Sequence, residues 1–81
     1  MQRHTVCVST DQQFLHTFGR RLGDIRRKKG VTQERLAELV EVHRTYIGFI
    51  EQGKRNPTIA NINRIAKALG ISLKDLFGPF N

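Results

Sequence analysis

The sequence of 81 residues predicts an all-α fold, in which five helices form one small domain around a single core. From Phe14 onward, apolar residues recur three and four positions apart, which is the spacing of one helix face. Thr32, Thr58 and Ser72 each precede such a segment and are suitable helix N-caps. A glycine follows several of the segments, where a left-handed residue commonly ends a helix.

The first predicted helix covers residues 12–29, and Gly30 follows as its C-terminal cap. Residues 1–11, "MQRHTVCVSTD", show no helical period. We expect them to form an N-terminal arm in which "TVCVS" either pairs as a short strand or stays loose. The helical domain is therefore expected at residues 12–81.

Two short helices follow, joined by a tight connection at residues 40–42. The first is predicted at residues 33–39, directly after the cap residue Thr32. The second is predicted to begin near His43 and to end around Gln52, before a glycine and a proline-containing loop.

Two further helices complete the domain. The fourth begins after Thr58, and the fifth is a short helix after Ser72, which has a capping-box spacing to Asp75. The apolar face of the fourth helix consists of Ile59, Ile62, Ile65, Ala66 and Leu69.

The composition favours a basic cytoplasmic protein. Fourteen Lys and Arg against seven Asp and Glu give a formal net charge of +7, with a basic run at residues 20–29. Such a charge favours polyanions, nucleic acid or an acidic membrane surface, although basic faces also serve solubility alone. Cys7 is the only cysteine, so no intrachain disulfide can form and a reducing compartment is expected. No apolar run is long enough for a membrane span.

The second and third predicted helices have the spacing of a helix-turn-helix. Two helices that cross steeply over a short turn need a small residue at the crossing, and Ala37 supplies one. In this geometry the second helix of the motif enters the DNA major groove.

Residues from about Phe18 to Phe77 resemble the XRE family of helix-turn-helix regulators, the group of phage repressors and Cro. The resemblance is carried by "TQERLAELVEV", "RTYIGFIEQGKRNP" and "NINRIAKALGIS". The second of these segments also resembles the controller proteins of restriction-modification systems, although free-standing regulators and antitoxins share it. The resemblance implies a compact five-helix, phage-repressor-like DNA-binding domain.

The family's base-contacting positions correspond to Arg44, Thr45 and Phe49. Arg is suited to guanine, where it bonds O6 and N7 together. The alternatives are a phosphate contact or a solvated side chain for Arg44, and a capping role for Thr45. Phe49 either packs on a thymine methyl group or belongs to the core, and Gly48 beside it would allow close approach of the DNA backbone.

The resemblance also implies phosphate contacts. Gln33 opens the second helix, where relatives bind a phosphate and brace the recognition helix. Tyr46 would contact a phosphate through its hydroxyl while its ring packs inward. The remaining candidates, for which a solvated polar surface is the alternative, are Lys54, Arg55, Asn56 and Asn61.

Three further positions are structural. Arg26 and Glu51 match an ion pair between the first and third helices of phage repressors. Glu41 holds a turn position that is commonly glycine in the family, and a left-handed backbone there would cost about 1–2 kcal/mol.

The sequence does not favour an enzyme or a metalloprotein. His4, His16, His43 and Cys7 do not give a zinc-binding spacing with enough ligands. No nucleophile or carboxylate has an evident base partner. We therefore expect no catalytic residue, no metal and no cofactor.

We expect a homodimer, because several large apolar groups near the end of the chain would otherwise form an exposed patch. These residues are Leu73, Leu76, Phe77 and Phe80. With the resemblance, this predicts an autoregulatory, sequence-specific regulator that binds double-stranded DNA at a palindromic operator, and a candidate controller of a restriction-modification system. Its small size leaves no room for a sensor domain.

RNA polymerase is a further expected partner, through the acids Glu34, Glu38 and Glu41, unless these only form a solvated face. The alternative function is an antitoxin, or another protein-interaction module, that also represses its own promoter.

Overall fold

The computed structural model describes residues 3–78, and the side chains of residues 11–78. Within this range the protein consists of helices, with no strand. In chain order these are α1 (Arg3–Lys28), α2 (Gln33–Val40), α3 (Arg44–Glu51), α4 (Ile59–Leu69) and α5 (Leu73–Phe77). The predicted all-α fold of five helices is confirmed.

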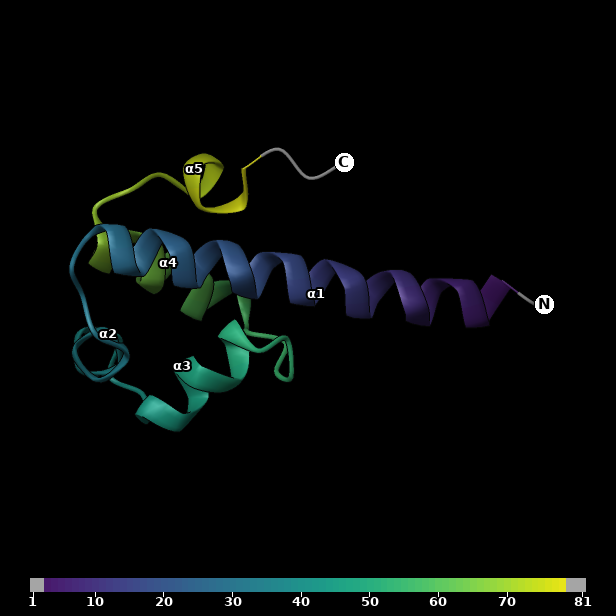
Figure 1. Ribbon diagram of the computed structural model, residues 1–81, viewed down its shortest axis with the longest axis horizontal. Helices are drawn as coiled ribbons and strands as arrows, with labels where there is room; N and C mark the ends of the chain where they lie inside the picture. Colours follow the sequence, from purple (N-terminus) through teal and green to yellow (C-terminus); the bar gives the residue numbers. More distant parts are fainter. Residues whose placement is uncertain (1–2, 79–81) are drawn as a thin grey trace.

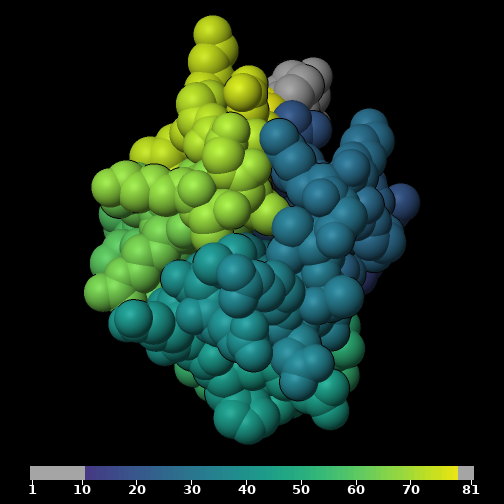
Figure 2. Space-filling view, turned by 90° about the vertical axis from the view of Figure 1, so that its left-hand side faces the viewer, coloured from purple at the N-terminus to yellow at the C-terminus, as the bar shows by residue number. Residues whose placement is uncertain are grey.

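The helices are arranged around the C-terminal half of α1 (Figure 1). Helix α5 packs on one side of α1 and α3 packs on the other, while α2 contacts α3 and α4. Seen from the end where α1 joins α2, the surface of α4 lies between α5 above and α2 below (Figure 2). The N-terminal part of α1 projects beyond the other helices, and no described helix is long and apolar enough to cross a membrane.

Helix α1 begins at Arg3, earlier than the residue 12 predicted from the sequence. From Arg3 onward the expected arm is therefore helical, and "TVCVS" is not a strand. The first eighteen residues contain no glycine or proline, so nothing in the sequence stops a helix there. Extending an existing helix by one residue is much easier than starting a new one.

The predicted caps define the N-terminal ends of α2, α4 and α5. Thr32, Thr58 and Ser72 each accept a hydrogen bond from the backbone N–H three residues later, at 3.0–3.1 Å. Gly30 and Gly70 are left-handed, with φ of 72° and 70°. These contacts confirm the predicted starts of α2, α4 and α5.

The core is a single cluster to which all five helices contribute. Its buried residues are Phe18, Leu22, Leu36, Ala37, Val40, Ile47, Ile50, Ile62, Ile65, Ala66, Leu69 and Leu76. Two residues of the predicted apolar faces are instead exposed: Phe14 in α1 is 44% exposed, and Ile59, the first residue of α4, is 77% exposed.

The C-terminal residues expected at a dimer interface have different environments. Leu76 is 0% exposed, so its assignment to an interface is wrong, and it is a core residue of its own chain. Phe77 is half-buried, with its ring centroid 5.3 Å from that of Phe18. Leu73 is 42% exposed and remains available, and Phe80 lies outside the described residues.

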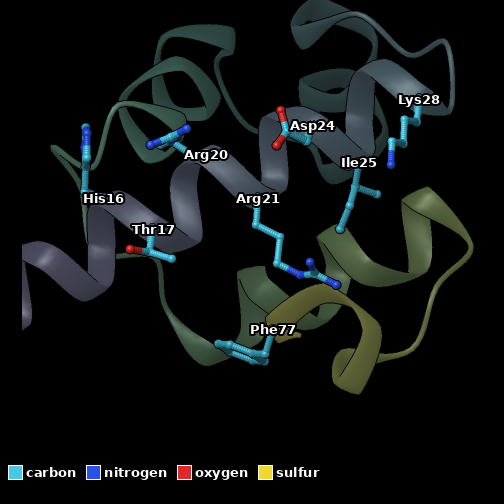
Figure 3. Close-up of a pocket in the computed structure, with 8 residues that line it drawn as sticks. All are labelled: His16, Thr17, Arg20, Arg21, Asp24, Ile25, Lys28 and Phe77. Atoms are coloured by element: carbon cyan, nitrogen blue, oxygen red, sulfur yellow. The ribbon is translucent and has the colours of Figure 1, made fainter. Parts of the chain in front are cut away.

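Helix α5 is fastened to α1 by Arg21. The guanidinium donates from Nη2 to the carbonyl of Asp75 at 2.7 Å and from Nε to that of Leu76 at 3.0 Å. The last carbonyls of a helix have no partner within the helix, so Arg21 satisfies them. The side chain lies in a hollow of about 430 Å³ between α1 and α5 (Figure 3).

Helix α1 crosses the end of α3 at a distance that only glycine allows. A Cβ atom on Gly19 would lie 2.3 Å from the Ile50 carbonyl oxygen and 2.5 Å from that of Glu51. A Cβ atom on Gly53 would lie 2.9 Å from the Cα atom of His16. These two approaches fix how close the C-terminal end of α3 lies to α1.

Candidate nucleic-acid interface

Helices α2 and α3 form the predicted helix-turn-helix, and Glu41 shapes the turn. Glu41 is left-handed, with φ of 66° and ψ of 45°, and is the one non-glycine residue with positive φ in the described part of the chain. After it, the Val42 N–H donates to the carbonyl of Ala37 at 3.0 Å. The penalty of about 1–2 kcal/mol for a side chain in this conformation therefore applies here.

The outer face of α3 carries the three residues expected to contact bases. Arg44 and Thr45 are exposed in its first turn, and Phe49 is 38% exposed one turn later. Ile47 and Ile50 are fully buried on the opposite face. Phe49 is therefore a surface residue, one turn along the helix from Thr45.

The N-terminus of α3 is capped by His43, which the sequence analysis did not identify. Its Nδ1 atom accepts a hydrogen bond from the Thr45 N–H at 3.1 Å. Thr45 lies inside the helix, so it is not the cap. Histidine is absent from the short list of preferred N-cap residues, and the usual pattern therefore misses it.

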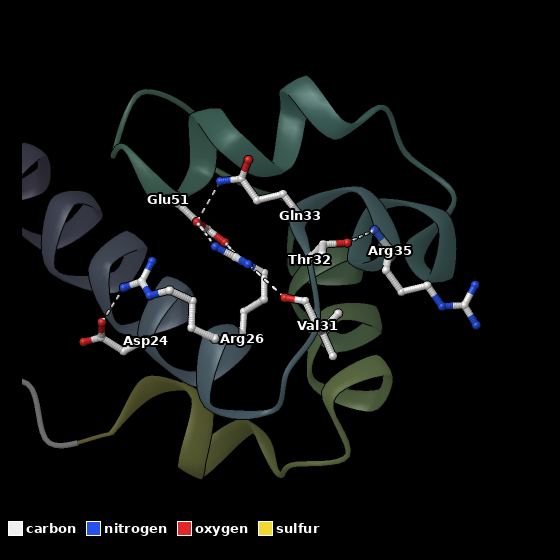
Figure 4. Close-up of polar contacts among 8 residues, drawn as sticks. Asp24, Arg26, Val31, Thr32, Gln33, Arg35 and Glu51 are labelled. Carbon is white, nitrogen blue, oxygen red and sulfur yellow. Dashed lines mark hydrogen bonds and ion pairs between the residues drawn. The ribbon is translucent and has the colours of Figure 1, made fainter.

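A buried polar network holds α3 from behind (Figure 4). Arg26 on α1 donates from Nε to Glu51 Oε2 at 2.6 Å and from Nη2 to Oε1 at 3.2 Å. Its Nη1 donates to the carbonyl of Val31 at 2.8 Å. The two charged side chains are only 10% and 9% exposed, so the expected ion pair is present and shielded from water.

Gln33, the first residue of α2, joins this network to that helix. Its Nε2 donates to Glu51 Oε1 at 2.9 Å. An amide nitrogen carries two donors, so the second N–H and the carbonyl oxygen of Gln33 are not used by this bond. The side chain can brace α3 and also bond a ligand, and its phosphate contact stays a prediction.

A second cluster joins α3 to α4 and to the loop between them. Asn61 Nδ2 donates to the hydroxyl of Tyr46 at 3.0 Å, and the guanidinium of Arg55 lies 5.3 Å from the centre of the Tyr46 ring. Lys54 and Asn56 are exposed on the same loop. Three of the residues predicted to contact phosphates, Tyr46, Arg55 and Asn61, thus lie against one another.

The basic run at residues 20–29 is not one continuous surface. Arg21 is bonded to α5, and Arg26 is buried beside Glu51. Arg27 pairs with Asp24 at 2.7 Å on the exposed side of α1. Part of the positive charge of this run therefore serves the fold, which charge counting alone cannot reveal.

Residues 22–76 match the HTH_3 helix-turn-helix family. The protein belongs to this family, the XRE-type regulators. The match begins within α1 and extends to Leu76 in α5, so it includes both polar clusters described above. Membership of this family identifies the protein as a DNA-binding transcriptional regulator.

Several relatives of this helix-turn-helix protein are named control proteins. Control protein C.BamHI from Bacillus amyloliquefaciens is 48% identical over 60 residues, covering 73% of this chain and 74% of the relative. Control protein C.MunI from Mycoplasma sp is 41% identical over 61 residues, covering 74% and 82%.

Solved structures agree with these matches. The restriction-modification controller protein C.AhdI from Aeromonas hydrophila has a TM-score of 0.75 and 44% identity, covering 76% of this chain and 94% of that one. The clp gene regulator ClgR from Corynebacterium glutamicum has a TM-score of 0.77 and 30% identity, covering 79% and 82%.

Removal of Arg26 should destabilise the fold far more than removal of its neighbour Arg27. Arg26→Ala leaves the Glu51 carboxylate buried without its cation, and we expect a loss of about 3–5 kcal/mol. Arg27→Ala breaks an exposed pair and should cost less than about 1 kcal/mol. Urea denaturation measures both free energies of unfolding.

The double variant Arg26→Met with Glu51→Leu should recover most of the loss, because buried ion pairs are often replaceable by apolar groups. Equal losses in Arg26→Ala and Arg27→Ala would show that the buried pair is not what holds α3.

Proposed function

We propose that this protein is a homodimeric regulator that binds a palindromic operator in its own promoter and controls a restriction-modification system. It acts by binding DNA and not as an enzyme. The names of its relatives C.BamHI and C.AhdI support the biological setting. The observation that carries the proposal is the exposed face of α3, with Arg44 and Thr45 at its leading end and a buried network behind it.

Base recognition would come from three residues of this face. Arg44 extends from the first turn of α3 and can bond the O6 and N7 atoms of guanine together. Phe49 offers an exposed ring to a thymine methyl group, and Thr45 can bond a base edge through its hydroxyl.

Phosphate contacts would come from both sides of α3. On one side lies Gln33, with one amide N–H unused by its bond to Glu51. On the other side, the Tyr46 hydroxyl accepts from Asn61, which leaves its own proton to donate to a phosphate. The stacked Arg55 adds a positive charge beside that hydroxyl.

Dimerisation would use the outer surface of α5, where Leu73 is exposed and Phe77 is half-buried. A two-fold dimer repeats every contact, which suits a palindromic operator. It would place the two copies of α3 in successive major grooves, about 34 Å apart.

Regulation would follow from protein concentration. A weak dimer binds DNA in proportion to the dimer population, and a second dimer fills a weaker adjacent site later. Activation at the first site requires contact with RNA polymerase, for which the exposed acids Glu34, Glu38 and Glu41 are our candidates. Glu38 already pairs with Arg35 at 3.1 Å, so Glu34 and Glu41 are the stronger candidates.

The DNA-binding proposal predicts different effects for Arg44 and Lys54. Arg44→Ala should cost about 1–3 kcal/mol on the preferred site and relax the preference at one base pair in each half-site. Lys54→Ala should weaken binding to all sequences alike and reduce the slope of log affinity against log salt by about one. Random-site selection followed by fluorescence anisotropy measures both effects.

Lys67→Ala is the matched control, because Lys67 lies in the last turn of α4, at the opposite end of that helix from the proposed DNA surface. It should leave affinity and preference unchanged. An Arg44→Ala variant with wild-type preference would refute the assignment of Arg44 to base recognition.

The dimer proposal predicts that Leu73→Glu produces monomers. The wild-type protein should sediment as a dimer at high micromolar concentration, and an acid at the first position of α5 is compatible with the helix dipole. Ile59→Glu is the matched control, because Ile59 is 77% exposed at the start of α4. If only Ile59→Glu breaks the dimer, the interface lies at that end of the molecule instead.

The autoregulation proposal predicts a promoter activity that first rises and then falls as protein accumulates. A reporter behind the protein's own upstream region, titrated with an inducible copy, measures this response. Arg44→Ala should flatten the curve. Repression at every dose, without an initial rise, would favour a simple repressor.

A further inference from the structure

His43 differs from the other N-cap residues in the size of its capping group. The caps Thr32, Thr58 and Ser72 use a small hydroxyl oxygen, whereas His43 uses one nitrogen of an imidazole ring. The hydrogen bond involves Nδ1, which accepts from the Thr45 N–H at 3.1 Å. The cap therefore uses only Nδ1 and gives no role to the second ring nitrogen, Nε2.

The capping bond determines where the ring proton lies. A neutral imidazole has one donor nitrogen and one acceptor nitrogen. Because Nδ1 is the acceptor, the proton is on Nε2, at the far side of the ring. His43 is exposed, and no hydrogen bond from Nε2 to any residue between 11 and 78 is present. The ring thus offers a donor to a ligand outside the chain.

The surroundings of this donor favour an anion. The exposed Arg44 follows His43 directly, and both lie at the positive end of the α3 dipole. His43 and Arg44 line a shallow hollow together with Glu34 and Glu38 of α2. The two acids disfavour an anion inside the hollow, so an anion would bind outside it, beside the exposed side chain of Arg44.

We propose that His43 has two roles: it caps the recognition helix through Nδ1, and it donates from Nε2 to a DNA phosphate beside the entry of α3 into the major groove. The inference rests on the proposed DNA-binding function and adds a contact residue to it. It also implies that the group that orders the first turn of α3 is the group that touches DNA.

The variant His43→Ser separates the two roles. Serine is a strong N-cap but is too short to replace the distal nitrogen of imidazole. We expect its thermal midpoint to stay near that of the wild type, whereas its affinity for preferred and scrambled DNA should fall by the same factor, roughly tenfold for a bond to a charged acceptor. His43→Asn, a second neutral cap, should behave in the same way.

Phosphate replacement then locates the contact. Operator duplexes that carry one methylphosphonate at a time remove single phosphate charges. At one position in each half-site, the wild-type protein should lose roughly tenfold in affinity, and His43→Ser should lose nothing further. His16→Ser, which alters an exposed histidine on α1, is the matched control and should lose as much as the wild type.

Wild-type affinity in both His43→Ser and His43→Asn would overturn the proposal and leave only the cap. A loss confined to the preferred sequence would also overturn it, because it would indicate a base contact. Failure of the DNA-binding proposal would look different, since the wild-type protein would then select no sequence from a random pool.

Discussion

The buried ion pair between Arg26 and Glu51 is the interaction on which the DNA-binding surface depends. It joins α1 to the C-terminal end of α3, and through Gln33 and the carbonyl of Val31 it also holds the segment that leads into α2. Two short helices of eight residues would be marginal in isolation. The network fixes them on a long helix, so α3 presents its outer face in one orientation. Its two charged side chains are buried in a small domain, and each has hydrogen-bond partners within the network.

Much of the fold could be predicted because local signals agreed with the tertiary structure. Thr32, Thr58 and Ser72 form the caps that their positions suggested, and α4 buries its predicted apolar face except for Ile59. The helix-turn-helix followed from spacing, and the ion pair followed from the family resemblance. These features depend on residues close in sequence or on motif positions that relatives share.

The remaining features depend on contacts between distant residues. The spacing of Leu73, Leu76 and Phe77 suggests one apolar patch, but only the packing of α5 on α1 decides that Leu76 is buried and Leu73 is exposed. The hydrogen bond from Arg21 to the carbonyl of Asp75 joins residues 54 positions apart, so no local sequence pattern predicts it. His43 was missed as a cap because its role depends on the rotamer of a ring, not on a preferred residue type. The sequence did not predict the first part of α1, because residues 1–11 lack a helical period of apolar residues. That they also lack glycine and proline is a weaker signal for a helix.

The close approach of Gly19 to the carbonyl oxygens of Ile50 and Glu51 has a consequence for engineering. Mutational tolerance should differ sharply between the side of α3 that meets α1 and its outer side. At its C-terminal end almost any side chain on Gly19 would force the backbones apart, whereas Arg44, Thr45 and Phe49 face away from the core. A combinatorial library at those three outer positions can therefore vary the surface chemistry while the scaffold stays constant. One fold, with its core and its contact between α1 and α3 unchanged, would then present many different recognition surfaces.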